Sequence, residues 1–355
     1  MIYELTYIES DGTVPYRNLA IEEYLLRHVK PEECILYLWQ NRKTVVIGRN
    51  QNGWKECRIG RLECLVGKLK EDNGCVVRRL SGGGAVFHDL GNLNFTFLVQ
   101  EENYNLEKQL EVILKAVNKL GIHAVKSGRN DITVEGRKFS GNAFLNLDRH
   151  CYHHGTLMVN VNVEDLSKYL NVSQEKLRSK GVDSVKSRVA NLTEFCPELT
   201  ISLLKEKLLE AFEEVYGLSA KKITPDMLEK KELDQAEEKF SSWEWIFGRR
   251  MEFQYEIDTR FPWGGVTMQL QVNKGIITDM QIYSDAMEQG FISRIPEYLK
   301  GCRYGKEDLC VGMYRVPALN DGERMMMQDI QRFILEDGMT PAAGSEGQRR
   351  LYGNI

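Results

Sequence analysis

Residues 78–89 read RRLSGGGAVFHD, which places three consecutive glycines between two arginines and a short apolar run that ends at a histidine and an aspartate. Glycines lack a Cβ, so such a loop can approach a ligand closely and turn backbone N–H groups toward it. Arg78 and Arg79 add positive charge, which favours a carboxylate or a phosphate as the ligand. The pattern is neither a Walker loop nor a G-x-G-x-x-G loop. Taken alone, it is equally compatible with a flexible hairpin.

Short β-rich runs surround this loop. Residues 75–99 contain three predicted strands, and the runs at 34–39 and 44–49 predict a hairpin because a short polar stretch separates them. Further along, 131–147 predicts a second hairpin with a turn at Glu135-Gly136. One more strand is predicted within 152–163.

Helical and β-type spacings alternate irregularly over the whole chain. Five segments are predicted to be helical: 15–29, 105–120, 200–216, 285–300 and 321–337. Apolar residues alternate with polar ones on both sides of a turn at 273–275, which predicts a third hairpin. Because strands and helices do not follow strict βαβ order, the predicted fold class is α+β.

The composition shifts at 218–242, which is charged and poor in apolar residues, and this predicts a linker between two domains. We therefore expect a first domain over 1–217 and a smaller α+β domain over 243–337. The last segment, 338–355, has no apolar period and is expected to be a flexible tail.

The overall composition argues against several classes of protein. Of the 355 residues, 28% are charged and 42% hydrophobic, as in ordinary globular chains. Lys and Arg number 47 against 51 Asp and Glu, and the net charge of −4 argues against a general nucleic-acid binder. We find no apolar run of about 18 residues and no secretory signal, so we expect no membrane association. The eight cysteines are scattered without a C-x-x-C pair, which favours free thiols in the cytoplasm.

The segment GRNDITVEGRKFSGN, residues 128–142, places Lys138 in a predicted strand beside a tight turn. Strand alternation sends Arg137 and Lys138 to opposite faces. Asn130 and Asp131 are suited to a metal or a ribose hydroxyl, and equally to a turn.

Two later segments also contain candidate residues. The adjacent histidines of HHGT, residues 153–156, are predicted to face opposite ways along a strand, which argues against a chelating pair. The stretch KLRSKGVDSVKSRVANLTE, residues 176–194, is basic and serine-rich. Such a loop is able to close over a polyanionic ligand, although most charged runs are solvated surface loops.

Taken together and in this order, the four segments resemble the lipoate–protein ligase A family of the biotin/lipoate ligase superfamily. Residues 78–89 match the family's R-R-x-S-G-G-G-A-V-[FY]-H-D loop throughout, and 128–141, 153–156 and 180–194 match its later blocks. The resemblance covers about residues 5–335.

This resemblance implies a mixed sheet with flanking helices, related to the class II synthetases, followed by a smaller α+β accessory domain. It implies ATP-dependent activation of free lipoate to lipoyl-AMP and transfer of the lipoyl group to one lysine of a carrier domain. ATP and Mg²⁺ would be the cosubstrate and the metal, with no tightly bound prosthetic group. The implied partners are the lipoyl domains of 2-oxoacid dehydrogenase acyltransferase subunits and the glycine cleavage H protein, with no nucleic acid and no membrane.

The resemblance also implies roles for individual residues. Lys138 corresponds to the catalytic lysine, which contacts both the lipoyl carbonyl and the phosphate. The implied ATP-binding residues are Arg79, Gly84, Ala85, Val86, Phe87, Asn130, Asp131, Lys138, Lys180, Ser187 and Arg188. The implied lipoate-binding residues are Arg79, Ser81, Gly82, Gly83, Gly84, His88, Lys138 and His154. Asp131 is the implied Mg²⁺ ligand.

Two alternatives stay open at this point. An ATP-independent octanoyl- or lipoyltransferase on the same fold would use a cysteine nucleophile, for which Cys151, close to His153 and His154, is the candidate. Against it, the GRND block contains no cysteine, and such transferases generally lack a C-terminal domain. A non-catalytic lipoate-binding homologue is the second alternative, and the intact Lys138 and glycine loop argue against it.

Overall fold

The computed structural model describes residues 1–336 except 11, 54–73, 129–130, 170–188 and 250. The chain divides into two compact units. The first comprises Met1–Ile47, Gly53–Leu80 and Ala85–Phe247. The second comprises Gly48–Asn52, Ser81–Gly84 and the chain from Gly248 onward, so two short loops of the N-terminal half belong to it.

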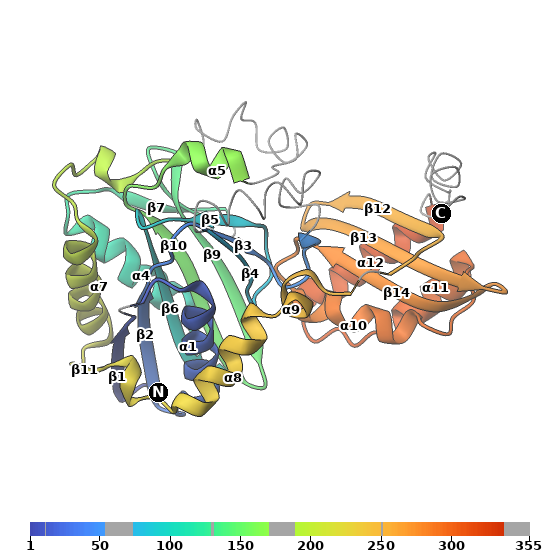
Figure 1. Ribbon diagram of the computed structural model, residues 1–355, viewed down its shortest axis with the longest axis horizontal. Helices are drawn as coiled ribbons and strands as arrows, with labels where there is room; N and C mark the ends of the chain where they lie inside the picture. Colours follow the sequence, from blue (N-terminus) through green and yellow to red (C-terminus); the bar gives the residue numbers. More distant parts are fainter. Residues whose placement is uncertain (11, 54–73, 129–130, 170–188, 250, 337–355) are drawn as a thin grey trace. The chain divides into compact units, whose positions relative to one another are not determined.

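An eight-stranded mixed sheet forms the centre of the first unit (Figure 1). In spatial order its strands are β11 (Ala220–Ile223), β1 (Glu4–Glu9), β2 (Glu33–Trp39), β6 (Asn92–Gln100), β10 (His150–Met158), β9 (Arg137–Leu147), β8 (Asp131–Val134) and β7 (Ala124–Ser127). The strands β11, β1 and β2 pair in parallel, and every other neighbouring pair is antiparallel.

The two faces of this sheet differ in chemistry. One face carries fully buried aromatic side chains such as Phe95, Phe97 and Phe139, and they pack in one core with α4 (Leu106–Asn118) and α7 (Ile201–Tyr216). Both helices begin at a side-chain cap, Asn105 for α4 and Thr200 for α7. The opposite face lies under α1 (Pro15–His28) and includes buried polar side chains, as described below.

A three-stranded sheet in the first unit contains β4 (Cys75–Arg78), β3 (Thr44–Ile47) and β5 (Val86–His88) in that order. The predicted hairpin between 34–39 and 44–49 is therefore wrong, because β2 and β3 belong to different sheets. Asn41 shows why the intervening stretch is not a solvated turn. Its side chain is fully buried and accepts a hydrogen bond from Asn18 Nδ2 at 3.0 Å.

The segment 218–242, predicted to be a linker, differs from that prediction because it folds as part of the first unit. The strand β11 extends the large sheet beside β1, and α8 (Lys230–Ser241) packs against α1. Leu233 and Phe240 are fully buried in the core that includes α1. Two well-placed apolar residues thus anchor a segment whose composition is mostly charged. The predicted tail, 338–355, lies outside the described residues.

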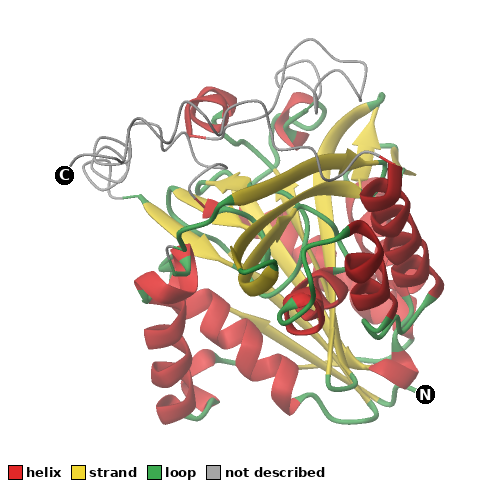
Figure 2. Ribbon diagram, turned by 90° about the vertical axis from the view of Figure 1, so that its right-hand side faces the viewer, coloured by secondary structure: helices red, strands yellow, loops and turns green. Residues whose placement is uncertain are grey.

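The second unit has an antiparallel sheet of β12 (Tyr255–Phe261), β13 (Gly264–Asn273) and β14 (Ile276–Ser284), shown in Figure 2. Its helices α10 (Gln289–Leu299), α11 (Lys306–Tyr314) and α12 (Asp321–Glu336) share a hydrophobic core with these strands. The hairpin predicted here is present and turns at Lys274 and Gly275, which both have positive φ.

The α+β class and the mixed sheet with flanking helices are confirmed. The five predicted helices correspond to α1, α4, α7, α10 and α12. The hairpin of β8 and β9 turns at Glu135 and Gly136 as predicted, with φ of 50° and 76°. Within the described ranges, no helix is long and apolar enough to cross a membrane.

Candidate active site

A cluster of polar side chains is buried under α1 in the first unit. We call it the buried polar cluster, and its members are Glu22, Trp39, Arg79, His88, Thr96, Tyr152 and His154. They come from α1, β2, β5, β6, β10 and the residue that follows β4, so segments distant in sequence meet at this place.

A hydrogen-bond chain runs through the cluster. Trp39 Nε1 donates to Thr96 Oγ1 at 3.1 Å, and the Thr96 hydroxyl donates to Glu22 Oε1 at 2.7 Å. His154 Nδ1 lies 2.8 Å from the same carboxylate oxygen. Because an ionised carboxylate only accepts hydrogen bonds, His154 Nδ1 carries the hydrogen. Glu22 therefore fixes the orientation of the His154 ring.

Arg79 brings a positive charge into this buried environment. Its side chain is 6% exposed, and Nη1 donates to the Val46 carbonyl at 3.3 Å. Burial lowers the pKa of Arg79 to about 10, while Tyr152 and Glu22 act in the opposite direction. Arg79 thus stays a cation at neutral pH. A buried charge is unfavourable unless a counter-charge lies nearby, and Glu22 supplies it.

His88 is neutral at physiological pH. Burial, followed by the positive charge of Arg79 and by His154, lowers the pKa of His88 to about 3. Its Nδ1 lies 3.3 Å from Asn41 Nδ2, whereas its buried Nε2 has no hydrogen-bond partner in the part of the chain that the structure describes. Leaving a buried polar atom unsatisfied is costly, so Nε2 is suited to a polar group of a ligand.

Lys138 of β9 and Asp131 of β8 meet near one end of the large sheet, with β7 beyond them. Lys138 Nζ lies 2.6 Å from Asp131 Oδ1, and the lysine side chain is 24% exposed. Asp131 and Thr133 project from the same face of β8, and they pair with Gly141 and Lys138 of β9, which therefore also share that face. Ala143, two residues after Gly141, lies on the same face and pairs with His154 on β10. Paired residues project from the same face of a sheet. The lysine amine and the buried polar cluster consequently share the α1 face.

The glycine-rich segment Ser81–Gly84 belongs to the second unit, where the backbone uses two of its glycines. The Gly83 N–H donates to the Ala286 carbonyl at 3.0 Å, and Gly83 has a φ of +86°. A Cβ on Gly82 would lie 2.4 Å from that same carbonyl oxygen. Packing and backbone conformation therefore explain two of the three glycines without a ligand.

The residues on either side of this segment have different roles. Arg78 is structural, because its guanidinium donates to the carbonyls of Trp245 and Ile246 at the end of α9 (Trp243–Phe247). Phe87, implied to contact the nucleotide, is buried in an apolar cluster and stacks on Tyr169 with ring centroids 5.4 Å apart. Only its backbone is therefore suited to a ligand. Ala85 and Val86 are half-buried.

Residues 14–213 match the family model for the lipoyl protein ligase A/B catalytic domain, and residues 250–334 match the model for the bacterial lipoate protein ligase C-terminus. The chain belongs to the lipoate–protein ligase A family. A lipoate-protein ligase A from Psychrobacter cryohalolentis is 40% identical over 317 residues, which are 86% of this chain and 91% of the relative.

Solved structures agree with this assignment. P. falciparum LipL1 in complex with lipoate has a TM-score of 0.81 and 29% identity, covering 94% of this chain and 100% of that chain. A crystal structure of lipoate-protein ligase A bound with ATP has a TM-score of 0.58 and 25% identity, covering 70% of this chain and 99% of that chain. The family, the fold and the ligase activity predicted from the sequence are confirmed.

The structure of this ligase also addresses the cysteine alternative. Cys151 is buried in the core on the face opposite α1, and burial, with Glu101 nearby, raises the pKa of the thiol to about 11. A thiol that stays protonated at neutral pH is a poor nucleophile. His153 faces that core, where its ring contacts Phe95 and Phe144, while His154 faces α1, so the two histidines point to opposite faces as predicted.

Four of the implied site residues, Asn130, Lys180, Ser187 and Arg188, lie outside the described residues. Conversely, four cluster members were not singled out from the sequence: Glu22, Trp39, Thr96 and Tyr152. The signal for Glu22 was present, because it lies three residues after Leu19 and four before Leu26 on the apolar side of α1. A carboxylate at a core-facing helix position indicates a buried polar partner.

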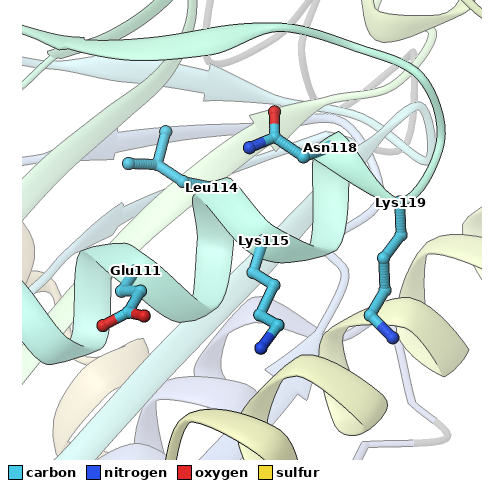
Figure 3. Close-up of a pocket in the computed structure, with 5 residues that line it drawn as sticks. All are labelled: Glu111, Leu114, Lys115, Asn118 and Lys119. Carbon is cyan, nitrogen blue, oxygen red and sulfur yellow. The ribbon is translucent and has the colours of Figure 1, made fainter.

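A shallow depression on α4 is separate from the buried polar cluster. Figure 3 shows its lining residues Glu111, Leu114, Lys115, Asn118 and Lys119. Both lysines pair with carboxylates of α7, at 2.9 Å from Lys115 to Glu214 and 3.1 Å from Lys119 to Glu210. These ion pairs connect two surface helices, and none of the implied site residues lies there.

Proposed function

We propose that this ligase activates free lipoate with ATP to form lipoyl-AMP and transfers the lipoyl group to a lysine of a lipoyl carrier domain. The observation that carries the proposal is the placement of the Lys138 amine on the same sheet face as the cluster that contains Arg79 and His154. Related structures bound to lipoate and to ATP support these two substrates.

The first step needs positive charge at a fixed position. A lipoate carboxylate oxygen forms a bond with the α-phosphorus of ATP while the bond to pyrophosphate breaks, so two anions approach each other. Preorganised cations in a water-poor site stabilise such a transition state. Lys138 is half-buried and Arg79 is buried and charged at neutral pH. We assign contact with the lipoyl carbonyl and the phosphate to Lys138, and additional charge stabilisation to Arg79.

The lipoyl group itself is mostly apolar. Val77 and the partly buried Val86 belong to the same hydrophobic cluster as Tyr152, a member of the buried polar cluster. We propose that the acyl chain packs against such residues, and that His88 Nε2 and His154 provide polar contacts.

The second step requires no side-chain nucleophile from this chain. The amine of the carrier lysine attacks the acyl carbon of lipoyl-AMP, the bond to AMP breaks, and the amine gives up a proton. Exclusion of water protects the mixed anhydride from hydrolysis. The buried side chains of the cluster, such as Tyr152 and His88, are suited to excluding water.

Asp131 supplies part of what a Mg²⁺ site needs. Magnesium typically takes one or two carboxylates in addition to substrate phosphates, and Asp131 offers one carboxylate. Among the described residues no group of three or more His, Cys, Asp or Glu side chains is arranged to hold a metal alone. When bound, Mg²⁺ would neutralise phosphate charge. Asp131 in the present structure pairs with Lys138, so its role for this chain is also to hold that amine.

We further propose that the first unit performs the chemistry and that the second is an accessory domain. The proposed acceptors are lipoyl domains of 2-oxoacid dehydrogenase acyltransferase subunits and the glycine cleavage H protein. A cytoplasmic location is proposed because the six cysteines within the described ranges are all free thiols.

The proposal is tested by ATP–pyrophosphate exchange with lipoate, octanoate and biotin in parallel, followed by mass spectrometry of a lipoyl domain incubated with ATP and the active acid. We expect lipoate-dependent exchange, no exchange with biotin, and a mass gain of one lipoyl group on one lysine. Lipoate binding without exchange would instead favour a non-catalytic homologue. Acyl transfer from acyl-carrier protein without ATP would favour a transferase.

A further inference from the structure

We infer that Gly141 is a positioning residue for Lys138. The absence of a side chain at position 141 leaves the space in which the end of the Lys138 side chain lies, and so determines where the amine meets Asp131. The inference rests on the role proposed above for Lys138.

A β-bulge brings residues 138 and 141 together. Ile132 pairs with Ser140 while the next residue on β8, Thr133, pairs with Lys138, so Phe139 is the extra residue on β9. In a regular strand, residues three apart project from opposite faces. Because the bulge adds one residue, Lys138 and Gly141 project from the same face. Bulges commonly re-aim a side chain next to an active site.

The bulge also explains the ion pair. Gly141 pairs directly with Asp131 across the two strands, so the lysine must extend over Gly141 to reach the carboxylate. A Cβ on Gly141 would lie 2.7 Å from Lys138 Nζ and 2.9 Å from its Cε. Both separations are too short for two non-bonded atoms, so any side chain at 141 would displace the amine.

Among the described residues, only the lysine would have to move. The next nearest atom to this Cβ is Thr156 Oγ1 at 3.9 Å, an ordinary contact, and the φ of Gly141 does not lie in the left-handed region. The described part of the fold therefore has no requirement of its own for glycine at this position. Gly155 on the neighbouring strand is different, because its Cβ would lie 2.8 Å from the rigid backbone carbonyl oxygen of Gly141.

This contrast makes the role of Gly141 measurable. Misplacing a reacting group by about 1 Å reduces rates by about 10²-fold. For Gly141→Ala we therefore expect a 10- to 100-fold fall, as an order-of-magnitude value, in kcat for lipoate-dependent ATP–pyrophosphate exchange. The temperature of unfolding should stay within about 2 °C of the wild type.

The experiment compares Gly141→Ala, Lys138→Ala, the double variant and the matched control Gly12→Ala, measuring exchange kinetics and thermal unfolding for each. Within 4 Å, a Cβ on Gly12 would meet no described atom except Ser10 Oγ, at 3.9 Å, so this control should behave as wild type. If Gly141 acts through Lys138, adding Gly141→Ala to Lys138→Ala should cause no further loss.

Three results would overturn the inference: a normal kcat for Gly141→Ala, a large fall in its unfolding temperature, or a further loss in the double variant. Lys138→Ala with normal exchange would instead contradict the proposed function of Lys138. The two failures are thus distinguishable within one set of variants.

Discussion

Acidification from pH 7 to pH 5 should destabilise the first unit through two buried histidines, His88 and His153. Burial is the main cause that lowers the pKa of each histidine from 6.5 to about 3. Arg79 and His154 lower the pKa of His88 further, and His154 also lowers that of His153. Between these two values the unfolded chain binds more protons than the folded chain. The stability that the neutral rings provide is therefore complete above pH 6.5 and is lost as the pH falls toward 3.

The surroundings of His153 explain the size of the effect. Its ring lies among Phe95, Phe97 and Phe144, with centroid separations of 5.2, 5.9 and 5.1 Å. Nε2 donates to Asn142 Oδ1 at 2.9 Å, and the buried Nδ1 finds no hydrogen-bond partner among the described residues. A proton added at Nδ1 would be a buried charge without an acceptor.

The magnitude follows from linkage. At pH 5 an unfolded histidine is about 1.5 pH units below its pKa, and each unit corresponds to about 1.4 kcal/mol. Each buried histidine therefore lowers the free energy of unfolding by about 2 kcal/mol at pH 5 relative to neutral pH, and the pair by about 4 kcal/mol.

Urea unfolding monitored by circular dichroism at pH 7 and pH 5 measures this difference. His153→Gln should reduce the pH dependence of the free energy of unfolding by about 2 kcal/mol, whatever its own effect at pH 7. The exposed His123 gives a matched control, because His123→Gln makes the same substitution at a position outside the core. An undiminished pH dependence in His153→Gln would refute the reasoning.

Two further variants test other statements made above. Cys151→Ser should keep lipoate- and ATP-dependent ligation within about two- to three-fold of wild type, because the thiol is buried and protonated. The assay is acyl transfer to a lipoyl domain. Complete loss of this transfer in Cys151→Ser would favour the cysteine mechanism. Gly82→Ala should lower the free energy of unfolding by about 1–3 kcal/mol, since its Cβ would overlap the Ala286 carbonyl. Thermal unfolding beside Gly12→Ala measures this change, and an unaltered midpoint would contradict the packing described for the glycine-rich segment.

Much of the fold could be predicted from local patterns. Amphipathic spacing identified α4 and α7, and the Glu135-Gly136 turn identified the hairpin of β8 and β9. The pairing of β2 and β3 could not be predicted in this way. A short polar stretch between two strands has the same sequence pattern whether the second strand pairs with the first or enters another sheet. The burial of Asn41, which the pattern does not reveal, distinguishes these two arrangements.

The candidate site, like the fold, could be predicted from the sequence only in part. Residue types in the motifs pointed to Arg79, Lys138 and His154, because charged and histidine side chains are recognisable in a sequence. Their arrangement depends on a bulge at Phe139, which local spacing does not encode. It also depends on Glu22, whose position on the apolar side of α1 indicates a buried polar partner but does not identify His154 as that partner. Arg78 and Arg79 are adjacent and chemically identical. Only tertiary packing assigns one to the carbonyls of α9 and the other to the cluster.

The central claim is that the Lys138 amine, held by Asp131 on the α1 face, serves the activation of lipoate. The most direct test measures Lys138→Ala in two assays, lipoate-dependent ATP–pyrophosphate exchange and transfer from preformed lipoyl-AMP to a lipoyl domain. The account predicts a loss of exchange of at least about 10²-fold, as expected when a preorganised charge is removed, together with impaired transfer. Near-normal exchange in a folded Lys138→Ala variant would contradict it.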